Sequence, residues 1–559
     1  MSKPRPDNPL IVQGGGMVLL DLHSPRADTA RQRLAAFAEL VRSPEHVHTY
    51  RIDALSVWNA RAAGLSAEAM AETLEDCAKY PLPEGYRSQL LELASRYGRV
   101  VLGPGEKGPV LHTDTQALAV LLAADAGVAP LLGDRVGPCA FSFAPRDRGW
   151  LKQALTAAGF PAEDLCGYED GDRLAVELRD GRHPAPSFAL RPYQEEAAAA
   201  FLGSSGRPGG SGVVVLPCGA GKTVVGLAVV AALSQQALVL CTSNTAVAQW
   251  RRELLSKTTV RAEDVAEYSG ERKEVGPITL ATYQMVTWRP AKDADFPHLA
   301  LLDVRRFGLI VYDEVHVVPA PIFRATAGLQ ARRRLGLTAT LVREDGREAD
   351  VFSLIGPKRF DIPWRILEDQ GFVAQAACTE LRVALSPERE LAYARAPRRA
   401  QFRVAAENER KEALAAELLD RHPGSRALVI GEYLSQLETL ARTLGAPLVS
   451  GKTPEPERRR LFDSFRQGGV SRLVLSRVGN FALDLPDADL LIQVSGTYGS
   501  RQEEAQRLGR ILRPKADGRV AHFYTLVSRH TCEEDFAGNR QRFLTEQGYA
   551  YRLEVAGSP

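Results

Sequence analysis

A strand, a glycine-containing loop and a helix follow one another in the segment that most constrains this chain. The apolar run Val213–Leu216 is followed by Gly219-Ala220-Gly221-Lys222-Thr223, and Val224–Leu233 has the composition of a buried helix. This order predicts a phosphate-binding loop, in which main-chain N–H groups at the helix start surround the phosphates of a nucleotide. Lys222 would reach the terminal phosphates, and the Thr223 hydroxyl would bind Mg²⁺.

The loop departs from the usual phosphate-loop pattern at one position. Leu216 stands where the pattern G-x-x-x-x-G-K-[ST] has a glycine. Taken alone, the segment therefore also fits a glycine-rich turn that merely precedes a helix. A second motif further along the chain separates these two interpretations.

This second motif is acidic and follows another apolar run. Gly308–Tyr312 is short and rich in β-forming residues, which predicts a buried strand, and it ends in Asp313-Glu314-Val315-His316. A carboxylate at the carboxyl end of such a strand, here Asp313, is suited to bind the same Mg²⁺ as Thr223. Glu314 would then polarise the attacking water as a general base. The alternative is a solvated acidic loop end, which the order of the two motifs disfavours.

An arginine-rich segment near the far end of the chain, Gln502–Arg513, has the composition of a helix. Gln506, Arg510 and Arg513 share one face by i, i+4, i+7 spacing. Arginine suits a γ-phosphate because its guanidinium is permanently charged, planar and bidentate. The alternative, a basic solvated helix, does not explain the strand-like run Leu490–Ser495 that precedes it. We expect two lobes that close on one nucleotide, with these three residues in catalysis.

The order of these motifs resembles that of superfamily 2 helicases, and within them the XPB-type DNA helicases, specifically the bacterial members. The resemblance covers nearly the whole chain. The segments that carry it are Leu190–Gln194, Gly219–Thr223, Cys241–Asn244, Ala281–Tyr283, Asp313–His316, Gly336–Thr340 with Arg343–Asp345, Ser476–Gly479 with Leu483–Pro486, and Gln506–Arg510. The resemblance implies ATP and Mg²⁺ as cofactors, single-stranded or forked DNA as the substrate, and movement in the 3′-to-5′ direction.

The resemblance also assigns roles to further residues. Arg191 and Gln194 would read the adenine, and Asp484 would link bound ATP to the nucleic acid from the second lobe. The residues implied in nucleic-acid contact or coupling are Thr242, Ser243, Thr282, Thr338, Thr340, Arg343, Glu344 and Asp345. One segment departs from the commoner pattern, because Asn480–Ala482 stands where many relatives have an acidic residue and glycine. This departure would alter the efficiency of coupling.

Composition and cysteine usage exclude several classes of protein. Apolar residues make up 45% of the chain and charged residues 25%, which is typical of a soluble globular protein. The sequence has no apolar run as long as a membrane span, and Met1–Pro9 lacks the build of a signal peptide. The 7 cysteines include no C-x-x-C pair, which favours reduced thiols over disulfides, a zinc site or an iron–sulfur cluster. We therefore expect a cytoplasmic protein, and we expect it to be a monomer.

Charge is divided unevenly along the chain. Residues 1–190 contain 20 Lys and Arg against 24 Asp and Glu, whereas residues 191–559 contain 50 against 44. A mildly basic second part permits binding to nucleic acid, although a motor also contacts phosphates through main-chain N–H groups and hydroxyls.

Strand-like runs alternate with helical patterns, which predicts an α/β protein with mostly parallel sheets. In residues 186–365 the expected strands are Val213–Leu216, Ala237–Cys241, Ile278–Ala281, Leu309–Tyr312 and Leu335–Leu337. In residues 366–559 they are Ala427–Ile430, Pro447–Val449, Leu473–Leu475, Leu490–Val494 and Phe523–Val527. These segments would be two RecA-like motor lobes, and the first would bind ATP at the carboxyl ends of its strands.

The segments 1–98 and 99–185 are expected to be two N-terminal α+β accessory domains. Their expected elements are a hairpin at Leu10–Leu22 and helices at Arg31–Val41, Ala67–Tyr80, Thr115–Ala124 and Trp150–Ala158. In XPB relatives this region holds a domain that touches DNA near damage or distortion. The alternative is a domain that caps the motor, and the residues favour neither.

A long charged stretch, Leu385–Arg421, lies between the strands of the second lobe and those of the first. It has a helical composition, and Pro397 should divide it into two helices. In XPB relatives a helical thumb that grips DNA occupies this place. The alternative is a solvated helix pair, because glutamates dilute the charge of the arginines.

The expected activity is that of an ATP-dependent DNA helicase or translocase in DNA repair or related remodelling, with a repair nuclease or another repair protein as a partner. One rival is a duplex-DNA translocase or ATP-driven switch without processive unwinding, which would carry the same motifs. A second is a scaffold with a vestigial ATPase, which the intact set Lys222, Asp313, Glu314 and Arg510 disfavours. An RNA substrate is a third, because main-chain and hydroxyl contacts to phosphates discriminate weakly between DNA and RNA.

Overall fold

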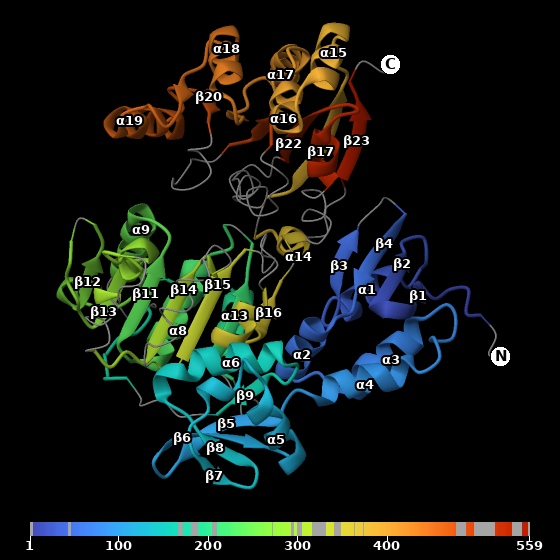
Figure 1. The fold of residues 1–559 in the computed structure, drawn as a ribbon. Coiled ribbons are helices and arrows are strands. Elements are labelled where there is room, and N and C mark those ends of the chain that lie inside the picture. The colour runs from blue at the N-terminus through green and yellow to red at the C-terminus, as the bar shows by residue number, and fades with distance from the viewer. Residues whose placement is uncertain are drawn as a thin grey trace. The chain divides into compact units, whose positions relative to one another are not determined.

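The computed structural model describes most of the chain (Figure 1). The described residues are 4–42, 46–165, 171–179, 188–203, 210–217, 219–270, 272–291, 296–298, 305–315, 331, 333–339, 348–362, 364–372, 374–476, 488–496, 520–538 and 551–556. The chain divides into two compact units, which are described separately. The first comprises Met1–Val215 and Thr223–Asp361, and the second comprises Leu216–Lys222 and Ile362–Pro559. Within the described residues, no helix is long and apolar enough to cross a membrane.

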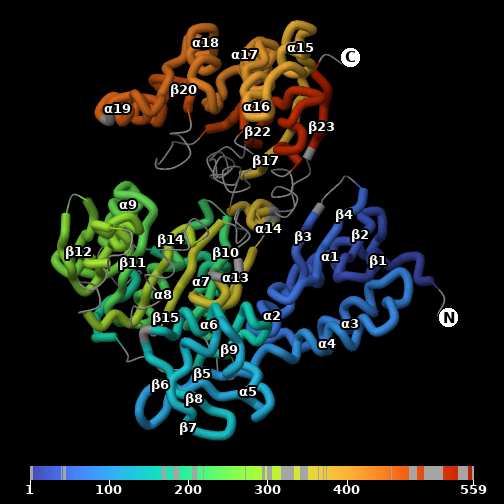
Figure 2. The backbone as a smooth tube through the Cα atoms, in the orientation of Figure 1, coloured from blue at the N-terminus to red at the C-terminus, as the bar shows by residue number. Residues whose placement is uncertain are grey.

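A small antiparallel sheet begins the first unit (Figure 2). Its strands, in spatial order, are β1 (Leu10–Val12), β2 (Met17–Asp21), β4 (Val47–Arg51) and β3 (Glu39–Arg42). Helices that share its core are α1 (Ala27–Leu34), α2 (Ala54–Ala62), α3 (Ala67–Cys77) and α4 (Tyr86–Ser95). The predicted hairpin over Leu10–Leu22 is confirmed, with a 3₁₀ turn, η1 (Gly14–Gly16), between its strands.

The predicted helix over Arg31–Val41 is wrong in its second half. Helix α1 ends at Leu34, and Glu39–Arg42 forms strand β3. Glu39 lies opposite Arg51 on β4, and their side chains form an ion pair at 2.8 Å. Pairing with a neighbouring strand therefore overrides the helical pattern of this segment.

A mixed sheet follows in the first unit. Its strands, in spatial order, are β7 (Arg135–Gly137), β8 (Ala140–Ser142), β6 (Gly108–Thr113), β5 (Val100–Gly105) and β9 (Ala162–Asp164). The other elements here are α5 (Gln116–Ala124), α6 (Arg148–Ala157), η2 (Ala129–Leu131) and η3 (Pro145–Asp147). Helices α5 and α6 confirm two predicted helices and share one apolar core with the sheet.

The first parallel sheet completes the first unit. Its strands, in spatial order, are β12 (Val265–Tyr268), β13 (Ile278–Thr282), β11 (Ala237–Cys241), β14 (Leu309–Asp313), β15 (Arg333–Thr338), β10 (Ser211–Val215) and β16 (Lys358–Asp361). The accompanying helices are α7 (Pro192–Leu202), α8 (Lys222–Leu233), α9 (Asn244–Lys257), α10 (Tyr283–Val286), α13 (Glu348–Leu354) and the turn η4 (Ala262–Asp264). The predicted strands of this sheet are confirmed, but β12 and β16 were missed because edge strands carry polar residues and lack a continuous apolar run.

The N-terminal sheets and the first parallel sheet contact each other within this unit. The main-chain N–H of Lys358 donates to Asn59 at 3.4 Å, and Arg359 donates to the carbonyl of Ala62 at 3.3 Å. Helix α6 packs against α13. At the end of β9, Asp164 accepts from Lys152 at 3.1 Å and from Arg148, and all three side chains are largely buried. These contacts fit the interpretation in which the N-terminal region caps the motor.

The second parallel sheet lies in the second unit. Its strands, in spatial order, are β19 (Leu448–Val449), β20 (Arg472–Leu475), β18 (Ala427–Ile430), β21 (Leu490–Gln493), β22 (Ala521–Ser528), β17 (Ala376–Val383) and β23 (Tyr551–Val555). Its further helices are α14 (Trp364–Asp369), α18 (Leu434–Leu444) and α19 (Glu455–Arg466). Strand β17 was missed because it carries Glu380, which is buried and accepts from Arg382 at 2.9 Å. The two parallel sheets are typical of RecA-like lobes.

The charged stretch Leu385–Arg421 forms separate helices, but the predicted number is wrong. Pro397 divides it as expected, and a second break at Glu407–Glu409 leaves α15 (Pro387–Arg395), α16 (Arg398–Ala406) and α17 (Arg410–Arg421). Asn408 causes the second break. Its buried side chain accepts from the N–H of Arg410 at 3.2 Å and donates to Ser528 at 3.2 Å. Asparagine favours such helix starts because its side chain replaces a missing helical partner.

A buried ion pair ties α17 to the second parallel sheet. Lys411 and Glu533 are both within 2% of full burial, with 2.6 Å between Nζ and Oε2. Lys411 also donates to the carbonyl of Val494 at 3.1 Å, and Glu533 accepts from the N–H of Ser528 at 2.9 Å. Each charged group of the pair therefore has both its counter-charge and a main-chain hydrogen-bond partner.

Replacing Glu533 by glutamine is expected to destabilise the second unit. The change removes the carboxylate that pairs with the buried ammonium of Lys411, and breaking such a pair costs about 3–5 kcal/mol. Urea unfolding should therefore shift to a clearly lower midpoint. Glu417→Gln is the matched control, because Glu417 pairs with Arg421 on the exposed face of α17. Equal midpoints for the two variants would contradict this account.

Candidate active site

The predicted site residues of the first parallel sheet lie at one edge. Strands β13, β11, β14, β15 and β10 are neighbours in that order and run parallel, so their carboxyl ends meet at the same edge. Asp313 ends β14 and Thr338 ends β15 opposite Val215, the last residue of β10. On the other side, Thr282 ends β13 opposite Cys241, which ends β11. The topology therefore gathers residues as far apart in sequence as Val215 and Thr338.

The glycine-containing loop connects β10 to α8. Gly219 and Gly221 have φ angles of 82° and 84°, in the left-handed region that other residues adopt at a cost. The N–H of Ala220 donates to the carbonyl of Pro217 at 3.1 Å, which closes a turn. Helix α8 begins at Lys222, two residues earlier than predicted, and Thr223 is its next residue. Leu216, the departure from the usual pattern, is buried. The position therefore serves packing, and the turn is made by the later glycines.

Asp313 and Glu314 lie where β14 gives way to the following turn. Asp313 Oδ2 accepts a hydrogen bond of 3.0 Å from the indole N–H of Trp250, and the Asp313 carbonyl accepts one of 2.9 Å from Tyr283. Glu314 has a φ of 52°, which is unusual for a residue with a side chain. Such a conformation costs about 1–3 kcal/mol and clusters at active sites. The catalytic role of Glu314 stays a prediction.

The charge of Asp313 affects the pKa values of two buried neighbours. Burial, together with the charge of Asp313, raises the pKa of the Cys241 thiol well above its usual value. The same two causes, burial first, raise the pKa of the Tyr283 hydroxyl well above its usual value. Tyr283 therefore keeps its proton at neutral pH and remains a donor to the main chain of Asp313.

Arg191 and Gln194, predicted to read the adenine, lie at the start of α7. Gln194 is buried, and its side-chain oxygen accepts from the N–H of Arg191 at 3.0 Å. Arg191 donates to the hydroxyl of Tyr193 at 3.2 Å. Helix α7 packs against β10, the strand that leads into the glycine loop. The structure thus brings this motif to the strand that carries the predicted phosphate site.

The residues predicted to contact nucleic acid in this unit begin helices. Ser243 caps α9 by accepting from the N–H of Ala246 at 3.2 Å, and Thr242 precedes it. Thr282 caps α10 by accepting from the N–H of Met285 at 3.4 Å. Thr338 is fully buried at the end of β15. The hydroxyls of Ser243 and Thr282 therefore cap helices at the same edge of the sheet where they were predicted to contact nucleic acid.

Several predicted site residues lie outside the described residues. They are Thr340, Arg343, Glu344, Asp345, Asp484, Gln506, Arg510 and Arg513. In the second parallel sheet, β20 precedes the segment that holds Asp484, and β21 precedes the segment that holds the arginines. Both strands are neighbours of β18 and run parallel to it, so their carboxyl ends lie at the same edge of the sheet.

Models of protein families match the three parts of the chain. The model of the ERCC3/RAD25/XPB C-terminal helicase matches residues 367–556. The model of the type III restriction enzyme res subunit matches residues 187–343. A model described as helicase conserved C-terminal domain matches residues 10–137.

Proteins of known name extend the likeness to the whole length. The chain is 52% identical over 548 residues to DNA 3′-5′ helicase XPB of Kineococcus radiotolerans, covering 98% of this chain and 96% of that protein. It is 48% identical to the protein of the same name from Mycobacterium tuberculosis, with 98% of both chains covered. The chain belongs to the XPB family of DNA 3′-5′ helicases. The resemblance to the bacterial XPB-type members of superfamily 2 is therefore confirmed.

The fold of this XPB-family chain also occurs in a more distant enzyme. The ATP-dependent type ISP restriction-modification enzyme LlaBIII, solved bound to DNA, has a TM-score of 0.50 and 12% identity. The match covers 72% of this chain and 34% of that one, and it concerns the fold alone.

Sequence reasoning missed Trp250 and the hydroxyl of Tyr283 as contacts of Asp313. Trp250 belongs to the buried stripe Val247, Trp250 and Leu254 on α9, which predicts nothing beyond packing. The sequence could have predicted only that Trp250 has some acceptor, because a buried indole N–H usually donates a hydrogen bond. Which acceptor it finds depends on the packing of α9 against β11 and β13, and that is not written in the local sequence.

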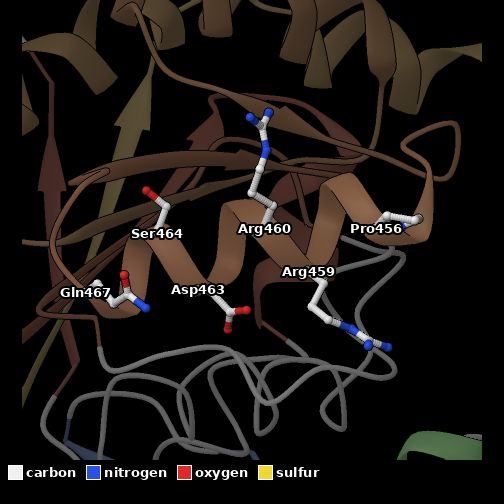
Figure 3. A pocket seen from close by; sticks show the side chains of 6 residues that line it. All are labelled: Pro456, Arg459, Arg460, Asp463, Ser464 and Gln467. Atoms are coloured by element: carbon white, nitrogen blue, oxygen red, sulfur yellow. The ribbon is translucent and has the colours of Figure 1, made fainter.

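Helix α19 of this XPB-family chain lines a surface hollow of about 630 Å³ (Figure 3). Its lining residues are Pro456, Arg459, Arg460, Asp463, Ser464 and Gln467. Asp463 is paired with Arg466 at 2.6 Å, which offsets its charge. The lining holds neither a glycine loop nor a strand-end carboxylate, and we assign the hollow no part in ATP hydrolysis.

Proposed function

We propose that this chain uses the energy of ATP, bound with Mg²⁺, to separate DNA strands in the 3′-to-5′ direction during DNA repair or related remodelling. The observation that supports this proposal is the topology of the first parallel sheet, in which β14, which ends at Asp313, β13 and β11, which precede the capping residues, and β10, which precedes the glycine loop, end at the same edge. The family to which the chain belongs supports DNA as the substrate.

The first lobe would bind the nucleotide and the metal. Lys222 would reach the terminal phosphates, and Arg191 and Gln194 would hold the adenine. The hydroxyl of Thr223 and the carboxylate of Asp313 fit Mg²⁺, because this cation prefers oxygen ligands. When bound, Mg²⁺ would neutralise charge on the β- and γ-phosphates. Glu314 would accept a proton from the attacking water.

The second lobe would complete the site. Arg510 and Arg513 would stabilise charge on the transferring phosphoryl group, with Gln506 on the same helical face, and Asp484 would link this lobe to the nucleotide. Thr242, Ser243 and Thr282 would contact the DNA backbone from the first lobe, and Thr338 and Thr340 would transmit the nucleotide state. The helices α15–α17 would serve as the thumb that contacts DNA.

The charged trio Arg343, Glu344 and Asp345 is expected to act in strand separation. Changing all three to alanine should spare much of the DNA-stimulated ATPase rate while reducing strand displacement, because the change removes a wedge or grip at the fork and leaves the phosphate site intact. Both rates should be measured on one preparation. Arg261, Glu263 and Asp264, changed together, provide a control with the same charges on another turn. A parallel fall of both activities would place the trio in ATP coupling, and no change in either would leave it a solvated loop.

The favoured rival is a duplex-DNA translocase that distorts DNA without processive unwinding. Two measurements decide between them. The first compares ATPase rates in the presence of single-stranded DNA, duplex DNA and RNA, and the second compares strand displacement with triplex displacement. The proposal predicts stimulation by DNA above that by RNA, and strand displacement. Triplex displacement without strand displacement would favour the translocase, and a rate unaffected by any nucleic acid would favour a scaffold.

A further inference from the structure

Trp250, on helix α9, forms a hydrogen bond with Asp313, the predicted metal ligand, although α9 is not part of the predicted phosphate site. It lies on α9, is 1% exposed, and donates its indole N–H to Asp313 Oδ2 at 3.0 Å. A hydrogen bond to a carboxylate is charge-assisted and about twice as strong as one between neutral groups. The bond therefore restricts the rotation of the Asp313 carboxylate.

The ring of Trp250 is itself held in place by α8, the helix that begins at Lys222. A Cβ added at Gly226 would lie 2.4 Å from Trp250 Cη2, closer than real contacts allow. Gly226 therefore lets the indole lie against the main chain of α8. The same ring lies against α8 and is hydrogen-bonded to the last residue of β14, so its N–H cannot turn away from Asp313 without repacking the ring against α8.

Asp313 is also held through its main chain. Tyr283, on α10, donates to the Asp313 carbonyl at 2.9 Å, so both the carboxylate and the backbone of this residue are fixed from neighbouring helices. These two helices are capped by Ser243 and Thr282, which are proposed to contact DNA. Each helix therefore has a proposed DNA-contacting residue at its N-cap and a side chain that donates a hydrogen bond to Asp313.

We propose that Trp250 is a positioning residue for Mg²⁺, which orients the Asp313 carboxylate toward the metal of the bound nucleotide. The inference rests on the proposed role of Asp313 as a metal ligand. Groups that hydrogen-bond to metal ligands orient them, and their removal typically lowers metal affinity by about 10–100-fold. The nucleotide itself would be held by other residues, so its metal-free affinity does not depend on Trp250.

The test measures Mg²⁺ affinity through nucleotide binding and does not need turnover. A fluorescent ATP analogue is titrated onto full-length protein in EDTA and then at rising Mg²⁺. Trp250→Phe keeps most of the ring and removes the N–H, and it should raise the Mg²⁺ concentration needed for half-maximal tightening about 10-fold, with metal-free affinity unchanged. Trp58→Phe is the matched control, because Trp58 is also buried and donates to the Leu93 carbonyl at 3.0 Å. It should change neither value.

A double-mutant cycle separates positioning from a general packing defect. In an Asp313→Asn background, Trp250→Phe should have no further effect on the Mg²⁺ requirement, because the carboxylate it orients is gone. Additive effects, an unchanged Mg²⁺ requirement in Trp250→Phe, or an equal loss of metal-free affinity would overturn the proposal. If Asp313→Asn alone left the Mg²⁺ requirement unchanged, the metal role of Asp313 would fail, and the role of Trp250 would fail with it.

Discussion

Glu314→Gln should slow ATP hydrolysis by about 10²–10⁴-fold, the usual contribution of a positioned general base. The carboxamide keeps the size of the side chain but cannot accept a proton from water. The main-chain conformation at Glu314, with a φ of 52°, is set by the strand end and the turn, so the variant should still fold. Binding of ATP and of DNA should therefore persist while turnover is lost.

The measurement for Glu314→Gln combines steady-state ATPase rates with equilibrium binding of ATP and single-stranded DNA. Glu263→Gln is the control, since Glu263 is exposed and pairs with Arg261 on the turn η4. It should leave all three values unchanged. Near-normal turnover in Glu314→Gln would remove Glu314 from its assigned role, whereas a joint loss of turnover and ATP affinity would indicate damage to the phosphate site.

Arg510→Ala should depress ATP turnover by about 10³-fold or more, which is what an arginine finger contributes to phosphoryl transfer. The first lobe should still bind the nucleotide, because the glycine loop and Lys222 are unaffected. The loss should appear in kcat more than in KM, since the arginine is proposed to act on the charge that develops in the transition state.

Two further variants sharpen the test of Arg510. Arg510→Lys restores a charge but not the bidentate geometry, so it should recover only part of the rate. Arg466→Ala removes an exposed arginine of α19, which pairs with Asp463, and should leave turnover unchanged. A fall of only a few-fold in Arg510→Ala would mean that the second lobe completes the site with other residues.

The interior strands were predictable because they are buried on both faces. Runs such as Ala237–Cys241 and Ala427–Ile430 became β11 and β18 with the predicted bounds. Such strands need continuous apolar sequence, which periodicity reveals directly. Strands β16 and β23 lie at sheet edges, and their sequences Lys358–Asp361 and Tyr551–Val555 include charged residues that hide them.

Other features depend on contacts between distant segments, and local sequence does not encode them. Strand β3 exists because Glu39–Arg42 pairs with β4, and the break before α17 exists because Asn408 reaches Ser528 on β22. The motifs themselves predicted Asp313 at a strand end, because motif order and strand topology are linked in parallel sheets. The bond from Trp250 to Asp313 required the packed structure.

The most direct test of the central claim is strand displacement on DNA with a single-stranded tail on either the 3′ or the 5′ side of the duplex. The account predicts displacement from the 3′-tailed substrate, which a motor moving 3′-to-5′ along its loading strand enters from the tail. Displacement should require hydrolysable ATP and be lost in Glu314→Gln. Preference for the 5′-tailed substrate, or displacement that persists without ATP hydrolysis, would contradict it.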